Sequence, residues 1–332
     1  MNQDFNQTLK NLSQVLAKDL QAVNELILTK MDSDVPLISQ IAQHLIKAGG
    51  KRIRPLLTIL AYKMFSNNNN NKYLLIAACV EFIHSATLLH DDVVDENESR
   101  RSIPTSNHIW GNKSSVLVGD FLFSKAFELM VATESLEVLQ ILSRASSVIA
   151  QGEVLQLMEI NNIHLSLATY NKIIYSKTAS LFGAATQVGA LIAGANMQDV
   201  QTILKFGENL GMVFQITDDV LDYQSQDNIL GKSIGTDFKE GKITLPIILL
   251  LQKANENEKS FLVRTFQEVK QKPEDFQELL TYLNKYDVFA EIQNIKKDYM
   301  DQTLTLMKSI KVNNIYKNIC LDLIESSTQR NF

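Results

Sequence analysis

The apolar positions of this 332-residue chain recur mainly at helical spacing. Between turn signals lie segments of roughly 15 to 30 residues in which apolar side chains return at i, i+3, i+4 and i+7. The apolar stretch 243–251 is rich in Leu and continues the helical pattern, so it does not predict a strand. The pattern predicts an all-α fold, a single domain over residues 1–332 with about a dozen helices and no sheet.

Few residues break these predicted helices. The chain has only 5 Pro and 13 Gly, which favours long helices over a turn-rich β fold. Pro55 and Pro246 each stand near a predicted helix start, where the missing N–H does no harm. The turn signals are Gly49-Gly50, the Asn run 67–71, Ile103-Pro104-Thr105, Asn161-Asn162, Asn196, the 227–242 region and Lys272-Pro273.

Composition and charge exclude several classes of protein. The net charge is −5, which does not indicate non-specific binding of nucleic acid. Cys79 and Cys320 are far apart in apolar segments and form neither a zinc site nor a disulfide framework. Residues 1–30 lack the pattern of a signal peptide, and the nearly uncharged stretch 179–197 has the small residues of a packed core helix. We therefore expect a cytoplasmic protein without a transmembrane segment.

Two acidic clusters of the form Asp-Asp-x-x-Asp are the strongest local signal, at 91–95 and 218–222. Residues four apart on a helix share a face, and carboxylates so close together repel each other unless a cation lies among them. One cluster alone is well explained as a solvated helix end, but two clusters with apolar flanks are not. Carboxylate ligands favour Mg²⁺ or Mn²⁺, and Mg²⁺ commonly takes further ligands from substrate phosphates. The clusters predict a magnesium-dependent enzyme that acts on diphosphate esters.

Basic residues accompany both clusters. The segment 49–55 opens a helix with two glycines and places Lys51 and Arg54 on roughly one face, which is typical of an anion site. A loop of solvated charges is the alternative. Arg100 and Arg101 follow the first cluster, where they either bind outer diphosphate oxygens or cap a helix C-terminus.

Other polar groups are less specific. His84 lies two turns before the first cluster and either reaches the anion or is a hydrogen-bonded core histidine. Five further residues lie near the clusters or in the loop after the second, and each alone is more often a surface residue than a ligand: Lys177, Thr178, Gln215, Lys232 and Lys242.

Taken together, these motifs resemble the trans-isoprenyl (polyprenyl) diphosphate synthases. They run in the family's order over about residues 49–246: Gly-Gly-Lys-Arg-x-Arg-Pro, His-Asp-Asp-x-x-Asp with Arg-Arg, Lys177-Thr178, Phe214-Gln215, the second acidic cluster and Gly-Lys-Ile-Thr-Leu-Pro. The resemblance implies antiparallel helices around a deep apolar cavity, usually in a homodimer. It also implies sequential addition of isopentenyl diphosphate to an allylic diphosphate such as farnesyl or geranylgeranyl diphosphate.

The resemblance also implies a role for each matching residue. Mg²⁺ on the allylic diphosphate would be held by Asp91, Asp95, Asp218 and Asp222, supported by Asp92 and Asp219. Isopentenyl diphosphate would be bound by Lys51, Arg54, His84 and Arg101, and the allylic diphosphate by Arg100. The departing charge would be steadied by Lys177, Thr178, Gln215, Lys232 and Lys242.

Product length is expected to depend on the helix that carries the first cluster. Ala86 and Thr87, one turn before Asp91, are small, which favours a long product, and octaprenyl diphosphate for a quinone side chain is our expectation. Such a product would be handed to the membrane. The floor of the tunnel is predicted at Phe123, Phe127 and Met130, spaced i, i+4 and i+7.

Three rival functions remain at this point. A terpene cyclase or head-to-head synthase has no use for the basic residues assigned to isopentenyl diphosphate. A helical metal phosphohydrolase built on His90-Asp91 leaves the second cluster unexplained. A catalytically silent subunit of a heteromeric synthase usually loses one cluster, and this chain keeps both.

Overall fold

The computed structural model describes residues 5–47, 49–66, 70–100, 103–224 and 235–328, and helices dominate every one of these ranges. The long helices are α1 (Phe5–Val15), α2 (Ala17–Met31), α3 (Pro36–Lys47), α4 (Ile53–Phe65), α5 (Lys72–Val94), α7 (Asn112–Ala132), α8 (Leu136–Met158), α10 (Ser180–Ile192), α11 (Met197–Gln224), α15 (Asp275–Lys285), α16 (Val288–Ser309) and α17 (Ile315–Thr328). The shorter ones are α6 (Ser106–Trp110), α9 (Leu167–Ile174), α12 (Thr236–Lys239), α13 (Leu245–Lys253) and α14 (Glu256–Leu262). Two π-helical segments interrupt the series, η1 (Tyr175–Ala179) and η2 (Val263–Gln267).

The predicted fold class is confirmed, with two differences in detail. Short helices such as α6 and α12 raise the number of helices above the expected dozen. The expectation of no sheet is corrected by β1 (Ser99–Arg100), which pairs antiparallel with β2 (Ile103–Pro104). This two-residue ladder closes a hairpin and has no part in the core. Residues 67–69 of the predicted Asn loop lie outside the described residues.

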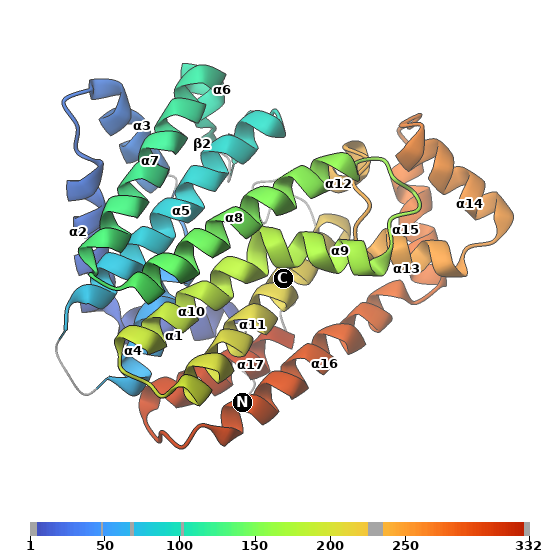
Figure 1. Cartoon of the computed structure of the whole chain (residues 1–332). Helices are drawn as coiled ribbons and strands as arrows, with labels where there is room; N and C mark the ends of the chain where they lie inside the picture. Colours follow the sequence, from blue (N-terminus) through green and yellow to red (C-terminus); the bar gives the residue numbers. More distant parts are fainter. Residues whose placement is uncertain (1–4, 48, 67–69, 101–102, 225–234, 329–332) are drawn as a thin grey trace.

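Helix α10 lies at the centre of the molecule, in contact with α4, α5, α8 and α11 (Figure 1). The sequence predicted a packed core helix here, and almost every residue of α10 is buried. Glycines let α4 and α11 approach α10 closely. A Cβ at Gly189 would lie 2.3 Å from the carbonyl oxygen of Thr58 on α4, and a Cβ at Gly207 on α11 would lie 2.4 Å from Thr186 Oγ1 on α10. Larger side chains at these positions would force α4 and α11 away from α10.

Helix α11 joins two hydrophobic cores. Its first half packs into the core that α4, α5, α7 and α10 share. Its second half, with Ile216 and Val220, packs into a core formed with α9, α13, α15 and α16. Helices α13, α14 and α15 gather at one end of the molecule, on the right in Figure 1. The second acidic cluster thus lies on the part of α11 that belongs to this second core.

Helix α5 is the one described helix that is long and apolar enough to cross a membrane, but 61% of its most apolar window is buried within the fold. We interpret it as a core helix. Both cysteines are buried, as expected, and burial raises the pKa of each thiol above its usual value. Pro55 and Pro246 lie in the first turns of α4 and α13, as predicted.

Candidate active site

The first acidic cluster lies at the C-terminal end of α5. Asp91 and Asp92 occupy the last turn, and Asp95 is the C-cap residue, whose N–H donates to the carbonyl oxygen of Asp91 at 2.8 Å. Carboxylates are unfavourable here because the C-terminal end of a helix carries partial negative charge. Burial, together with the charges of Glu153 and Asp95, raises the pKa of Asp91 to about 7, although the nearby cations Lys177 and Arg100 oppose the shift. The position therefore favours binding of cations.

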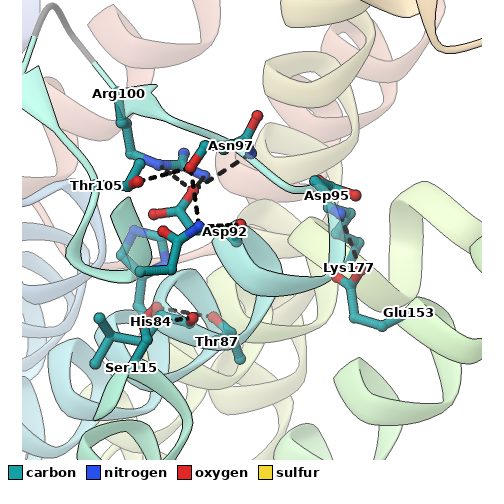
Figure 2. A network of polar contacts seen from close by, with 12 residues as sticks. His84, Thr87, Asp92, Asp95, Asn97, Arg100, Thr105, Ser115, Glu153 and Lys177 are labelled. Atoms are coloured by element: carbon teal, nitrogen blue, oxygen red, sulfur yellow. Dashed lines mark hydrogen bonds and ion pairs between the residues drawn. The ribbon is translucent and has the colours of Figure 1, made fainter. Parts of the chain in front are cut away.

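Asp92 is held apart from its two neighbours. It is buried, and its Oδ1 accepts hydrogen bonds from Arg100 Nη2 at 2.8 Å, Arg100 Nε at 3.1 Å and Asn97 Nδ2 at 3.3 Å (Figure 2). Arg100 stands on β1, so the small hairpin fixes this guanidinium group beside the first cluster. Asp92 thus holds the guanidinium group of Arg100 beside the first cluster, and its support of Asp91 and Asp95 stays a prediction.

The second acidic cluster lies near the C-terminal end of α11, so both clusters share the same unfavourable position on their helices. Asp219 is buried and accepts hydrogen bonds from the Tyr170 hydroxyl at 2.6 Å and from Gln215 Nε2 at 2.9 Å. Burial raises the pKa of Asp219 to about 6, although these two hydrogen bonds oppose the shift. Asp222 accepts the backbone N–H groups of Thr236 and Asp237 at 3.1 and 2.9 Å.

Lys177 and Thr178 reach the site from the π-helical segment η1. The widened turn brings Lys177 Nζ within 2.9 Å of Glu153 Oε2 on α8, and the Thr178 hydroxyl within 2.7 Å of Gln215 Oε1. Burial lowers the pKa of Lys177, but Asp91 and Glu153 more than offset this, so the pKa lies above its usual value. Figure 2 shows the Lys177 side chain between Asp95 and Glu153.

Lys242 connects the segment after the second cluster to the first cluster. Its Nζ lies 3.6 Å from Asp95 Oδ2 and 2.6 Å from Glu240 Oε2. Burial lowers the pKa of Lys242, but the charges of Asp95 and Glu240 outweigh it and the pKa is raised. This lysine therefore places α5 and the chain that follows α11 side by side.

Arg54, in the first turn of α4, lies near the second cluster, since the charge of Asp218 acts on it. Arg54 is partly buried over the ring of Phe182, 4.8 Å from its centroid. Burial lowers the pKa of Arg54 to about 10, while the charges of Glu81 and Asp218 oppose the shift. Lys51 is exposed, and its Nζ donates to Asn6 Oδ1 on α1 at 2.5 Å. His84 is half-buried on α5, and its carbonyl oxygen accepts the Thr87 hydroxyl at 2.8 Å.

Two predicted site residues, Arg101 and Lys232, lie outside the described residues. Printed contacts and charge interactions link Arg54, Arg100, Lys177, Thr178, Gln215 and Lys242 to the two acidic clusters. The places of Lys51 and His84 in the site stay predictions. The arrangement holds two sets of carboxylates, with basic groups between and around them, in a largely buried setting.

Comparison with known proteins identifies this arrangement. The profile of the polyprenyl synthetase family matches residues 35–283. The chain belongs to this family. It is 38% identical over 325 residues to octaprenyl diphosphate synthase of Haemophilus influenzae, covering 98% of each chain, and 45% identical over 240 residues to that of Escherichia coli, covering 72% of this chain and 74% of the relative.

Solved structures of family members share the whole fold. The crystal structure of a decaprenyl diphosphate synthase from Rhodobacter capsulatus superimposes with a TM-score of 0.92 at 40% identity, covering 97% of this chain and 99% of the other. A polyprenyl synthase from Caulobacter crescentus, complexed with calcium and isoprenyl diphosphate, gives a TM-score of 0.92 at 42% identity, covering 97% and 98%. The isoprenoid synthase-like all-α fold is therefore confirmed.

The donor set fits the divalent metal ions of this family. The candidate ligands are carboxylates, which suit hard cations of the Mg²⁺ type. Within the described residues, no three His, Cys, Asp or Glu side chains converge closely enough to form a metal site by themselves.

The predicted tunnel residues differ in their surroundings. Ala86 and Met130 are buried and Phe123 is partly buried. Phe127, in contrast, is 46% exposed on the outer side of α7. The floor of the tunnel at Phe123, Phe127 and Met130 stays a prediction, and within the single chain Phe127 is the exposed member of the three.

Several residues of the site were missed by the sequence analysis. Glu81 pairs with Arg52, Glu153 holds Lys177, and Tyr170 holds Asp219. The sequence held one hint for Glu153: its neighbour Gly152 lies inside a helical pattern, where a glycine often marks close packing against another element. The other two are single residues without a motif.

Proposed function

We propose that this chain is a long-chain trans-polyprenyl diphosphate synthase that adds isopentenyl diphosphate units to an allylic diphosphate and releases octaprenyl diphosphate. The observation that carries the proposal is the meeting of two carboxylate clusters with Lys177, Lys242, Arg54 and Arg100 in one site. Two of the similar relatives, from Haemophilus influenzae and Escherichia coli, are named octaprenyl diphosphate synthases, which supports the product class.

The first chemical step is ionisation of the allylic substrate. Its C–O bond breaks, both bonding electrons leave with the diphosphate oxygen, and the allylic carbon becomes a cation. Lys177 and Lys242 lie beside the first cluster, where each positive charge stabilises the departing diphosphate. Divalent cations held by Asp91, Asp95, Asp218 and Asp222 would supply further positive charge to the same oxygens. We propose Mg²⁺ as the ion used, with Mn²⁺ as a substitute.

The second substrate approaches from the basic segment. We assign isopentenyl diphosphate to Lys51, Arg54 and His84, together with Arg101. Arg54 lies close enough to Asp218 for the two charges to interact, so a diphosphate bound there would lie next to the allylic site. The double bond of isopentenyl diphosphate then attacks the allylic cation, and a proton is lost to the departing diphosphate.

Chain length is assigned to the helix that carries the first cluster. Ala86 has no side chain beyond Cβ, and Thr87 is small, so neither blocks a chain that grows along α5 from Asp91. A long product follows, used for a quinone side chain and handed to the membrane. Phe123 and Met130 remain our candidates for residues that limit its length.

We further propose that the protein is a cytoplasmic homodimer in which a second copy covers α7 and α8. The exposed large apolar residues on these helices recur at helical spacing: Leu117, Phe127 and Val131 on α7, and Val154, Leu157 and Met158 on α8. Helices α7 and α8 follow each other in the chain and contact each other (Figure 1), and we propose that their exposed apolar residues meet the partner.

The proposal is tested by incubating purified protein with farnesyl diphosphate, labelled isopentenyl diphosphate and Mg²⁺, and separating the products by length. We expect an octaprenyl product that disappears with EDTA and with Asp91→Ala or Asp218→Ala. Folded protein that incorporates no label is a silent subunit if an added partner restores synthesis. It is a phosphohydrolase if it releases phosphate from the substrates, and either result would overturn the proposal.

A further inference from the structure

We propose that Tyr170 is a positioning residue that, through Asp219 and Gln215, fixes the Thr178 hydroxyl so that only its oxygen lone pairs face the reacting substrate. The inference rests on the proposed function, because it assigns Thr178 to the allylic cation formed in that reaction.

A chain of three hydrogen bonds carries the inference. The Tyr170 hydroxyl on α9 donates to Asp219 Oδ2 at 2.6 Å. Gln215 Nε2 donates to Asp219 Oδ1 at 2.9 Å, and the Thr178 hydroxyl donates to Gln215 Oε1 at 2.7 Å. Tyr170, Asp219 and Thr178 are 2%, 6% and 5% exposed, so solvent does not compete for these bonds.

This series of hydrogen bonds has a definite donor-to-acceptor direction because a carboxylate only accepts hydrogen bonds. Asp219 therefore receives the hydroxyl of Tyr170 on one oxygen and the amide NH₂ of Gln215 on the other. The amide oxygen of Gln215 must then face Thr178, and it takes the hydroxyl proton of Thr178. A flipped amide would place its oxygen against the carboxylate and its NH₂ group against Thr178.

This direction suits the charge that develops during ionisation. Lys177 interacts with Asp91 and Asp95 of the first cluster, while the hydroxyl of Thr178 bonds Gln215, which in turn bonds Asp219 of the second cluster. We infer that this hydroxyl lies in the wall between the two clusters. A hydroxyl oriented with its lone pairs outward stabilises a carbon that becomes positive, and no reorientation is required at the moment of reaction. The amide of Gln215 is not a base, so Thr178 keeps its proton and is not activated as a nucleophile.

The test is a double-mutant cycle between Tyr170 and Thr178, measured as isopentenyl diphosphate addition to farnesyl diphosphate. Tyr170→Phe removes one hydroxyl and is expected to lower kcat by about 3- to 10-fold, with the KM values of both substrates nearly unchanged. In a Thr178→Val background the same change should have almost no effect, because the hydroxyl it orients is gone. A structural role for Tyr170 would give the same loss in both backgrounds.

The matched control is Tyr175→Phe. It removes a tyrosine hydroxyl on η1 that donates to Glu208 at 2.8 Å and takes no part in the three hydrogen bonds from Tyr170 to Thr178. Its kcat is expected to equal that of the wild type. If circular dichroism shows that Tyr170→Phe is unfolded at the assay temperature, Gln215→Met replaces it in the cycle, with the same expectation.

The outcomes separate the two proposals. Losses that are strongly coupled between positions 170 and 178 support the inference. Additive losses in an active enzyme overturn the inference alone. Wild-type protein that incorporates no isopentenyl diphosphate overturns the proposed function and the inference together.

Discussion

Gly152 decides how closely α8 packs against η1, and Gly152→Ala tests whether this packing positions the catalytic segment. A Cβ at this position would lie 2.4 Å from Ser176 Cβ and 3.3 Å from the backbone nitrogen of Lys177. Carbon atoms in ordinary contact are about 3.5–4.0 Å apart, so η1 must move by roughly 1 Å. The new methyl group therefore pushes on the segment that carries Lys177 and Thr178.

Two opposing effects determine how Gly152→Ala changes the free energy of unfolding. Replacing Gly by Ala within a helix stabilises it by about 1 kcal/mol, whereas overpacking costs about 1–3 kcal/mol. We expect a net loss of up to about 2 kcal/mol in the free energy of unfolding. A displacement of about 1 Å in a catalytic group costs on the order of 100-fold in rate, so kcat should fall far more than stability.

The assay compares kcat and urea unfolding for three variants. Ala150→Gly, at an exposed position of α8, measures the helix-propensity term directly. Gly152→Ala/Ser176→Gly removes the side chain that clashes and should recover part of the activity. A Gly152→Ala enzyme that is about 1 kcal/mol more stable and fully active would show that propensity alone acts there, and would refute the packing argument.

Three further predictions follow from other parts of the site. Glu153→Gln keeps a hydrogen-bond acceptor for Lys177 but removes the negative charge. Because the side chains of Glu153 and Lys177 are only 28% and 25% exposed, we expect kcat to fall by roughly tenfold. The control, Glu137→Gln at the exposed start of α8, should leave kcat unchanged. The pKa of Asp91 is raised to about 7 in the folded protein, so ionisation destabilises the metal-free fold increasingly as pH rises from about 4 to 7. Asp91→Asn should therefore raise the melting temperature in EDTA at pH 8 and hardly change it at pH 4, and a lower melting temperature at pH 8 contradicts the assigned electrostatics. Ala86→Phe should shorten the main product, and an unaltered product by chromatography would place the growing chain elsewhere.

Local patterns in the sequence predicted much of this protein. The acidic clusters were visible because their carboxylates recur at the spacing of one helical turn, and α10 was visible because its small apolar residues indicate a closely packed helix. Periodicity describes each helix separately, so it did not reveal which side of α7 faces outward, and it gave no sign that Phe127 is exposed in the single chain. Only the packing of α7 against its neighbours settles that orientation.

The contacts that orient the catalytic groups were not predictable from spacing. Glu153 and Lys177 are separated by the end of α8, a loop, the whole of α9 and the start of η1. Tyr170 and Asp219 are separated by η1, the whole of α10 and most of α11. A π-helical segment has no simple sequence signature, yet η1 determines where Lys177 and Thr178 point. Such residues act singly, through tertiary contacts, and leave no repeated pattern along the chain.

The placement of the acidic clusters explains why the site requires cations. Each cluster lies at the C-terminal end of its helix, where the partial charges of unpaired carbonyl groups add to the repulsion among carboxylates. In the described residues, Arg100 is bonded to Asp92 and Lys242 approaches Asp95, which offsets part of this charge. Burial is the largest cause of the raised pKa of Asp91, and the charges of Glu153 and Asp95 act in the same direction, while Lys177 and Arg100 oppose them. The fold thus keeps a local excess of negative charge that metal-bound diphosphate would relieve, so substrate and metal should bind cooperatively and stabilise the fold together.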